Sequence, residues 1–167
     1  MKTVCILFLV TLLAATSCQQ TPEPLTVNFE AEEASINDVF DNFNNAFIAG
    51  DVDSLASFLS EDLLGLGSDL NQEFNKKTVT DAWTQLFAAG PFAYETFGER
   101  LIKIAPDGKS ATVVEQYMMP VFSEFIPWRN SYHIIKIEDE WKILLFNTAL
   151  TPKDEHIPIF NAALASD

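Results

Sequence analysis

Apolar side chains in the first half of the chain recur at the spacing of a helix. The longest stripe repeats every three or four residues and consists of Ile36, Val39, Phe40, Phe43 and Phe47. Ser35 followed three places later by Asp38 is typical of a helix start, and Gly50 stands where helices commonly end. The pattern predicts a long first helix that opens the folded domain at about Ser35.

Two shorter helices and one short strand are expected next. Asp51 or Asp53 can cap the second helix. Its inner face consists of Leu55, Phe58 and Leu59. The apolar run 63–68 contains two glycines and is typical of an edge strand or a strand-like turn. The third helix extends from about Thr78 to Gly90. Its apolar stripe consists of Val79, Ala82, Trp83, Leu86 and Phe87.

From residue 92 onward, apolar residues alternate with polar ones, which is the period of a β-strand. Four strands are predicted, at residues 92–104, 110–119, 128–138 and 142–150. Turn residues at 106–109 and 138–140 supply tight connections, so neighbouring strands are expected to be antiparallel. Helices first and antiparallel strands afterwards predict an α+β domain with the helices packed on one face of the sheet.

The N-terminus has the pattern of an export signal. Lys2 is followed by residues 4–15, an apolar run in which Thr11 is the only polar residue. A transmembrane helix needs about 20 apolar residues, so this run is too short to span a membrane and predicts the core of a signal peptide. We expect residues 1–17 to be removed and the protein to be exported.

The end of this segment, Ala14-Ala15-Thr16-Ser17-Cys18, resembles a lipobox, the site where a lipoprotein signal is cleaved and the new N-terminal cysteine is acylated. The resemblance implies that lipid on Cys18 anchors the domain to a membrane surface of the cell envelope, periplasmic or outer. Ordinary signal cleavage, which would leave Cys18 as a free thiol, is the alternative. Cys5 leaves with the signal, so no intramolecular disulfide is expected. Residues 18–33, with two prolines and few apolar side chains, are expected to be the tether.

Composition excludes several classes of function. The formal net charge is −14 and no cluster of Lys and Arg exceeds the pair Lys76-Lys77, so nucleic acid is not expected as a partner. The two histidines, His133 and His156, are too few for a zinc-type cluster, and no phosphate-binding glycine loop is present. We therefore expect neither a metal nor a cofactor.

Three short motifs follow one another along the chain: residues 49–55 (Ala-Gly-Asp-Val-Asp-Ser-Leu), 66–69 (Leu-Gly-Ser-Asp) and 141–143 (Trp-Lys-Ile). Together they resemble the SnoaL-like domains, relatives of ketosteroid isomerase and nuclear transport factor two. The resemblance covers residues 34–152. It implies a cone-shaped fold, in which a curved antiparallel sheet wraps around the long first helix and two short helices, with a pocket inside and with two copies paired through the sheet. The family includes isomerases, cyclases, hydratases and members with no known reaction, so fold alone does not decide function.

Charged residues indicate which face of the last two strands is solvated. Lys136 and Glu138 mark the outer face of the strand before the turn, and Lys142 marks the outer face of the last strand. If Glu138 faces Lys142 across the turn, His133 lies opposite Asn147 on the inner face. A slip of one residue would move one of these side chains to the outside.

His133 and Asn147 are therefore candidates for the pocket wall. A histidine on an apolar face is more often a hydrogen-bonded structural residue than an acid or base, and both roles remain open. Asn147 can donate a hydrogen bond to a ligand carbonyl. In the family this position often carries His, with a small hydroxyl residue where this chain has Ala149, so the departure weakens an acid–base role here.

The middle hairpin allows the same argument. Its turn places Arg100 opposite Glu115 on the inner face, and Tyr117 continues that face. The charged pair is either a polar part of the pocket or a salt bridge at the rim of the sheet. Trp83 and Trp128 are further candidates for the pocket wall, with the core as the alternative for Trp83.

Residues 153–167 are too apolar for a free tail, and we expect them to pack back on the domain or to cover a partner's sheet. Because aromatic residues are abundant, the domain is expected to bind a small, largely apolar molecule. One alternative is a proton-transfer enzyme, an isomerase, hydratase or cyclase that acts through Glu115, Tyr117 or His133. The other is a dimeric interaction module of the envelope.

Overall fold

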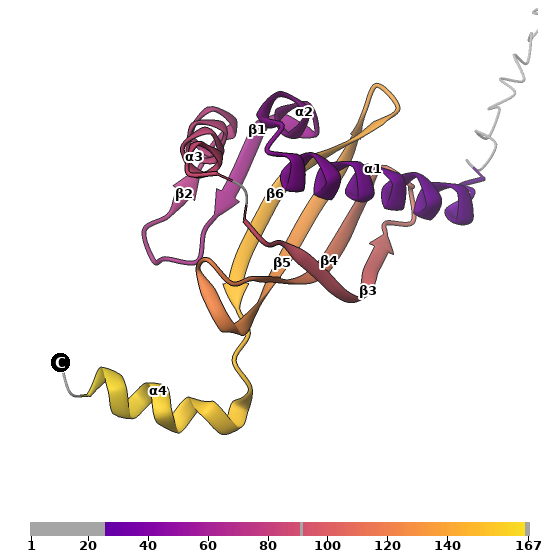
Figure 1. Ribbon diagram of the computed structural model, residues 1–167. Coiled ribbons are helices and arrows are strands. Elements are labelled where there is room, and N and C mark those ends of the chain that lie inside the picture. The colour runs from indigo at the N-terminus through magenta and orange to yellow at the C-terminus, as the bar shows by residue number, and fades with distance from the viewer. Residues whose placement is uncertain (1–25, 91, 166–167) are drawn as a thin grey trace, which may run out of the picture.

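The computed structural model describes residues 26–90 and 92–165 (Figure 1). Its helices are α1 (Phe29–Ala49), α2 (Val52–Ser57), α3 (Lys76–Ala88) and α4 (Ile157–Leu164), the last preceded by a 3-10 turn at Asp154–His156. Its strands are β1 (Leu59–Leu66), β2 (Glu73–Phe74), β3 (Glu95–Ile104), β4 (Ser110–Met119), β5 (Ser123–Ile137) and β6 (Glu140–Leu150). The expected signal segment, Cys18 and the first part of the expected tether lie outside the described residues.

The first helix begins earlier than its apolar pattern predicted. The side chain of Asn28 caps α1 by accepting a hydrogen bond from the backbone N–H of Ala31 at 3.2 Å. The expected start at Ser35 is wrong, because Ser35 lies inside the helix, and residues 29–33 of the expected tether belong to α1. The end is as predicted, since Gly50 adopts the left-handed conformation with φ 68°.

The six strands form one sheet in the order β2-β1-β6-β5-β4-β3. Strands β3 to β6 pair with one another in antiparallel fashion, as expected, but β1 runs parallel to β6. The parallel pairing is possible because no hairpin joins these two strands, which lie at opposite ends of the domain sequence. The run predicted as an edge strand is therefore an internal one, and the two-residue β2 forms the edge.

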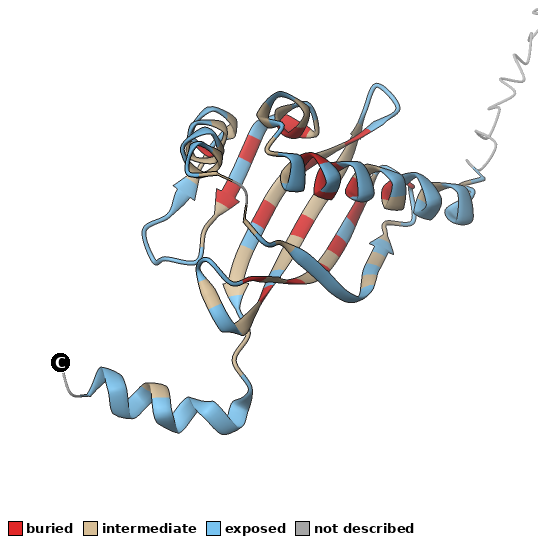
Figure 2. Cartoon of the chain, viewed as in Figure 1, coloured by how far each residue is buried: buried red, intermediate tan, exposed pale blue. Residues whose placement is uncertain are grey.

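The sheet is curved and unclosed, and α1 crosses its concave face (Figure 1). Most buried residues lie on this face and on the side of α1 that is turned toward it (Figure 2), and Leu55 of α2 and Val79 of α3 are buried as well. Ile36 and Phe40 of α1 are fully buried against Ile134 of β5 and Ile143 of β6, which are also buried. The α+β fold, with a curved sheet wrapped around a long first helix and two short helices, is confirmed.

The expected register of β5 with β6 is wrong because the connecting turn is tighter than assumed. Glu138 and Asp139 both have positive φ, so they form a two-residue turn and Ile137 pairs with Glu140. Farther along, Leu144 is an extra residue in β6, since His133 pairs with Leu145 while Ile134 pairs with Ile143.

His133 and Asn147 both lie on the face opposite to the predicted one, for different reasons. Tyr132 and Ile134 of β5 are buried on the inner face, so His133 between them points to the outer face. The bulge in β6 turns Phe146 inward and leaves Asn147 exposed. The predicted neighbourhood of His133 and Asn147 on the inner face is therefore wrong.

The assumption that a charged side chain marks the outer face fails at Lys136. Its ammonium group binds Glu32 of α1 and lies 5.3 Å from the ring centroid of Trp141. The indole N–H of Trp141 donates to the other carboxylate oxygen of Glu32 at 3.1 Å. Lys136 therefore lies on the inner side of the sheet, where a partner from α1 offsets the cost of burying its charge.

The predicted register of the middle hairpin is correct. Ile104 pairs with Ala111 and Ile102 pairs with Val113. The strand β3 then has a bulge, yet Arg100 Nε still contacts Glu115 Oε1 at 2.8 Å.

The C-terminal helix α4 extends away from the sheet (Figure 1) and contains no buried residue. The expectation that the tail packs back on its own domain is therefore not met by residues 153–165. Within the described part of the chain, no helix is both long enough and apolar enough to cross a membrane.

Candidate functional site

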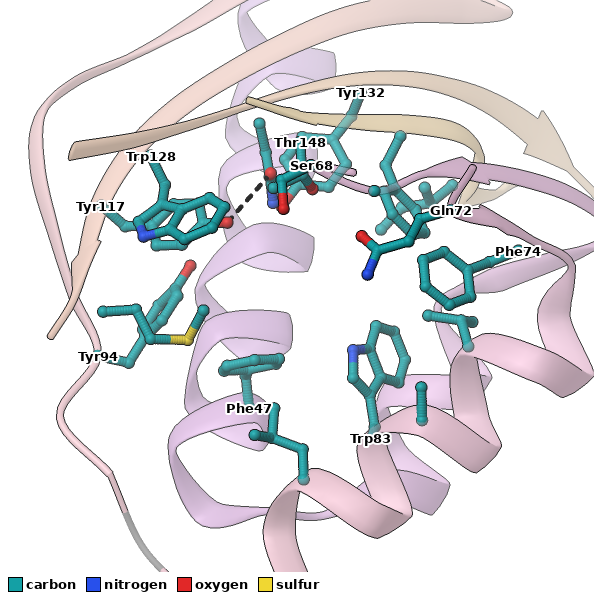
Figure 3. A pocket seen from close by; sticks show the side chains of 18 of the residues that line it. Phe47, Ser68, Gln72, Phe74, Trp83, Tyr94, Tyr117, Trp128, Tyr132 and Thr148 are labelled. Atoms are coloured by element: carbon teal, nitrogen blue, oxygen red, sulfur yellow. Dashed lines mark hydrogen bonds between the residues drawn. The ribbon is translucent and has the colours of Figure 1, made fainter. Parts of the chain in front are cut away.

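A cavity of about 320 Å³ lies between α1, α3 and the inner face of the sheet (Figure 3). Ten of the described residues that line it are aromatic, and none is Asp, Glu, Lys, Arg or His. Its helical walls carry Phe43 and Phe47 from α1 and Trp83 from α3. The remaining wall is formed by the sheet and by the connection between β1 and β2, which contributes Ser68 and Gln72.

Contacts between aromatic rings hold the walls in place. Phe47 meets the edge of Trp83 with centroids 6.3 Å apart and an interplanar angle of 88°. Tyr117 and Trp128 are stacked with centroids 6.3 Å apart, and Tyr94 lies 4.9 Å from Tyr117. Because each ring is packed against another, the open space between them is preformed.

A short chain of hydrogen bonds crosses the sheet side of the cavity. The hydroxyl of Tyr117 donates to Asn130 Oδ1 at 3.3 Å, and Asn130 Nδ2 donates to the hydroxyl oxygen of Tyr132 at 2.7 Å. Ser68 and Thr148 lie toward the same side of the cavity (Figure 3). This side of the wall can therefore offer hydroxyl and amide groups to a ligand.

A buried ionic cluster lies behind the tyrosines. Glu115, which is 4% exposed, accepts hydrogen bonds through Oε1 from Arg100 Nε at 2.8 Å and from Asn44 Nδ2 at 3.1 Å. Asn44 Oδ1 in turn accepts from the hydroxyl of Tyr94 at 3.3 Å. Arg100 also binds Asp41 at 2.8 Å. The cluster ties α1 to β3 and β4 and orients Tyr94 in the wall.

Burial raises the pKa of the hydroxyls of Tyr94, Tyr117 and Tyr132 above the ordinary range, and the charge of Glu115 adds to the effect at each. All three are therefore neutral at physiological pH and act as hydrogen-bond donors and acceptors rather than as bases.

Two buried polar atoms of this region have no hydrogen-bond partner among the described residues: Glu115 Oε2 and the indole N–H of Trp128. Trp128 lines the cavity and is 7% exposed. Buried polar atoms are rarely left unpaired in proteins, so both mark places where a water or a ligand group would be stabilised.

A family model described as a SnoaL-like domain matches residues 36–146, about two thirds of the chain. The chain belongs to the SnoaL-like domain family. A search among curated proteins found no match.

Solved structures share the fold of this SnoaL-like domain. An NTF2-like protein of unknown function from Shewanella baltica OS155 superposes with a TM-score of 0.62 and 14% identity, over 76% of this chain and 99% of that one. A domain of unknown function with a cystatin-like fold from Nostoc punctiforme PCC 73102 gives a TM-score of 0.65 and 16% identity, over 79% and 85%. At these identities the likeness concerns the fold alone.

The structure places the candidate residues of the SnoaL-like domain in three groups. Tyr117, Trp83 and Trp128 line the cavity. Arg100 and Glu115 form the buried cluster behind its wall. His133 and Asn147 lie outside the cavity, on the outer face of the sheet.

Six polar residues of the SnoaL-like site were missed: Ser68, Gln72, Tyr94, Asn130, Tyr132 and Thr148. Asn130 and Tyr132 share the strand parity of Trp128, which was a candidate, so they would have been found if Trp128 rather than Lys136 had been used to assign the inner face. Thr148 lies beyond the bulge of β6, and nothing in the alternation of residues indicates that bulge.

Within the described residues of the SnoaL-like domain, no group of three or more His, Cys, Asp or Glu side chains is arranged to hold a metal ion.

Proposed function

We propose that the domain binds a small, largely apolar molecule in the cavity between α1, α3 and the sheet. The observation that carries the proposal is the lining itself: a preformed space of about 320 Å³ with ten aromatic residues and a few hydroxyl and amide groups. Apolar walls with a small number of placed polar groups are the usual form of a site for a small organic molecule.

Binding without acid–base catalysis is favoured by the same lining. An enzyme that moves protons needs a group whose pKa lies near the working pH and which can reach the substrate. No described lining residue is a carboxylate or a histidine, and the pKa of each tyrosine hydroxyl is raised away from neutrality. The tyrosines are therefore suited to hydrogen bonding a ligand.

One observation favours the second candidate, a proton-transfer enzyme of the isomerase, hydratase or cyclase kind. Glu115 Oε2 is buried without a hydrogen-bond partner among the described residues, and Asn44 links the other oxygen of this carboxylate to Tyr94, which lines the cavity. Such an enzyme would exchange a carbon-bound proton of its ligand with deuterium from solvent, whereas a binding domain would not.

We also propose that the domain is displayed on a membrane surface of the cell envelope through lipid on Cys18. The support is the order of features in residues 1–18, an apolar run of signal-peptide length followed by small residues and a cysteine. The proposed ligand would then be met outside the cytoplasm, at the surface of the anchored domain.

Filling the cavity tests the binding proposal. Ala82 of α3 lines the cavity, and Ala88 of the same helix is exposed outside it. We expect Ala82→Phe to weaken binding of the neutral fluorescent probe N-phenyl-1-naphthylamine by at least about tenfold, because the new ring occupies the space of the ligand. Titration followed by fluorescence gives the Kd.

The matched control is Ala88→Phe, which adds the same ring away from the cavity and should leave the Kd unchanged. The cavity is not a binding site if both variants weaken binding equally, or if the unaltered protein shows no saturable binding of any neutral, cationic or anionic aromatic probe.

A further inference from the structure

Negative charge is in excess behind the tyrosine wall. Arg100 is bound by two carboxylates, Asp41 and Glu115, each at 2.8 Å, so one guanidinium faces two negative groups. Glu115 is joined to the wall through Asn44, whose amide contacts both Glu115 Oε1 and the hydroxyl of Tyr94. The second oxygen of Glu115 has no hydrogen-bond partner among the described residues to disperse its charge.

The negative charge of Glu115 affects the ionisation of the tyrosines that line the cavity. The carboxylate of Glu115 contributes to the raised pKa of the hydroxyls of Tyr94, Tyr117 and Tyr132, in addition to the effect of burial. A charge that disfavours a phenolate at the wall also disfavours any other anion placed there and favours a cation.

No positively charged side chain in the described lining offsets this preference for a cation. The lining contains no Lys, Arg or His, so an anionic ligand would lose its hydration without gaining a positive partner. The formal net charge of the chain, −14, acts in the same direction at longer range.

Aromatic rings supply an attraction that suits a positive charge. Phe47 and Trp83 lie at one side of the open space, and Tyr94, Tyr117 and Trp128 at another (Figure 3). The face of an aromatic ring attracts a cation within about 6 Å of its centroid, most strongly when the ring is that of Trp. A quaternary ammonium group can use this attraction without any hydrogen bond.

We propose that the ligand of this cavity is an organic cation, a protonated or quaternary amine whose hydrocarbon part fills the apolar space. The inference rests on the proposed binding function and names its ligand class. It combines the ring-lined cavity, the absence of positive side chains from its described lining and the excess of carboxylates behind it.

Three probes that share a benzyl group test the proposal on the full chain. They are benzyltrimethylammonium, its neutral carbon isostere neopentylbenzene, and the anion phenylacetate. We expect the cation to bind at least about fivefold more tightly than the neutral isostere, and phenylacetate to bind more weakly than both. Dissociation constants are measured by NMR titration at one ionic strength.

Two variants separate the causes. Trp83→Leu keeps the wall apolar but removes an aromatic face, and Glu115→Gln removes the negative charge behind the wall. Each should lower the ratio of the affinity for the cationic probe to the affinity for the neutral probe. If Glu115→Gln does not fold, Trp83→Leu alone decides the test. The control is Asp139→Asn, at the turn between β5 and β6, where Asn readily adopts the positive φ.

The outcomes distinguish this inference from the function on which it rests. If the neutral isostere or phenylacetate binds most tightly, the ligand class is overturned while binding in the cavity stands. If Asp139→Asn lowers the ratio of cation to neutral-probe affinity as much as Trp83→Leu does, the preference for the cation comes from the net charge of the protein rather than from the cavity. The proposal is then overturned. If no probe binds, the binding function fails as well.

Discussion

Arg100 joins three parts of the molecule through one side chain. Its Nε contacts Glu115 of β4, and its terminal nitrogens contact Asp41 and Asn37 of α1. The contact with Glu115 could be predicted, because the turn of the hairpin fixes which residues share a face. The contacts with α1 could not, because strand periodicity contains no information on how a helix lies across a sheet.

Removal of this guanidinium should destabilise the fold. In Arg100→Leu, the carboxylate of Glu115 stays buried and keeps only Asn44 as a hydrogen-bond donor. Breaking a buried ion pair from one side costs about 3–5 kcal/mol, and we expect a loss of this size in the free energy of unfolding by urea. The control, Asp41→Asn, alters the exposed partner of Arg100 and should cost about 1 kcal/mol or less. Equal losses would mean that Glu115 is not the important partner.

At the scale of elements, the sequence predicted correctly those helices and strands whose ends are marked by cap or turn residues. The end of α1 at Gly50 and the hairpin of β3 with β4 follow from turn and cap residues that are visible in the sequence. The prediction of which side chains of β5 point inward was wrong because Lys136 binds a carboxylate of α1, a segment far away in the sequence, on the inner side of the sheet. The prediction of which side chains of β6 point inward was wrong because the bulge at Leu144 reverses the inward and outward positions of the residues that follow it.

Gly50 both ends α1 and allows α3 to approach. Its φ is 68°, and a Cβ at this position would lie 3.3 Å from Phe87 Cγ of α3. Gly98 in β3 has a φ of 76°, but a Cβ there would meet nothing within 4 Å. Alanine at either site should cost about 1 kcal/mol for the left-handed backbone. We expect Gly50→Ala to lower the midpoint of thermal unfolding further than Gly98→Ala, and the reverse order would argue against close packing of the two helices.

For the whole molecule, the order of elements and three short motifs were enough to predict the class of fold. They did not distinguish an open cavity from a core filled by the same aromatic residues, since this depends on differences of a few ångströms in how rings pack. Pairing of two copies through the sheet stays a prediction. So does the lipid anchor, whose residues lie outside the described part of the chain.

The anchor is tested by changing one atom. In a bacterium that processes lipoproteins, we expect the unaltered protein to sediment with membranes and its N-terminal peptide to carry the mass of acyl chains. Cys18→Ser replaces sulfur by oxygen, removes the acceptor and should shift the protein out of the membrane fraction. Membrane association that survives Cys18→Ser without added acyl mass would point to a different means of attachment.

The position of β6 has a consequence for how the chain acquires its structure. This strand lies between β1 and β5, yet it is the last strand to be made, so β1 and β2 have no strand of the main sheet to pair with until residues 140–150 are available. Contacts between segments so distant in sequence form slowly, because a long loop must close first. A sheet that stays incomplete until residues 140–150 are made leaves the chain open for longer, and the export proposed for this protein would require an open chain.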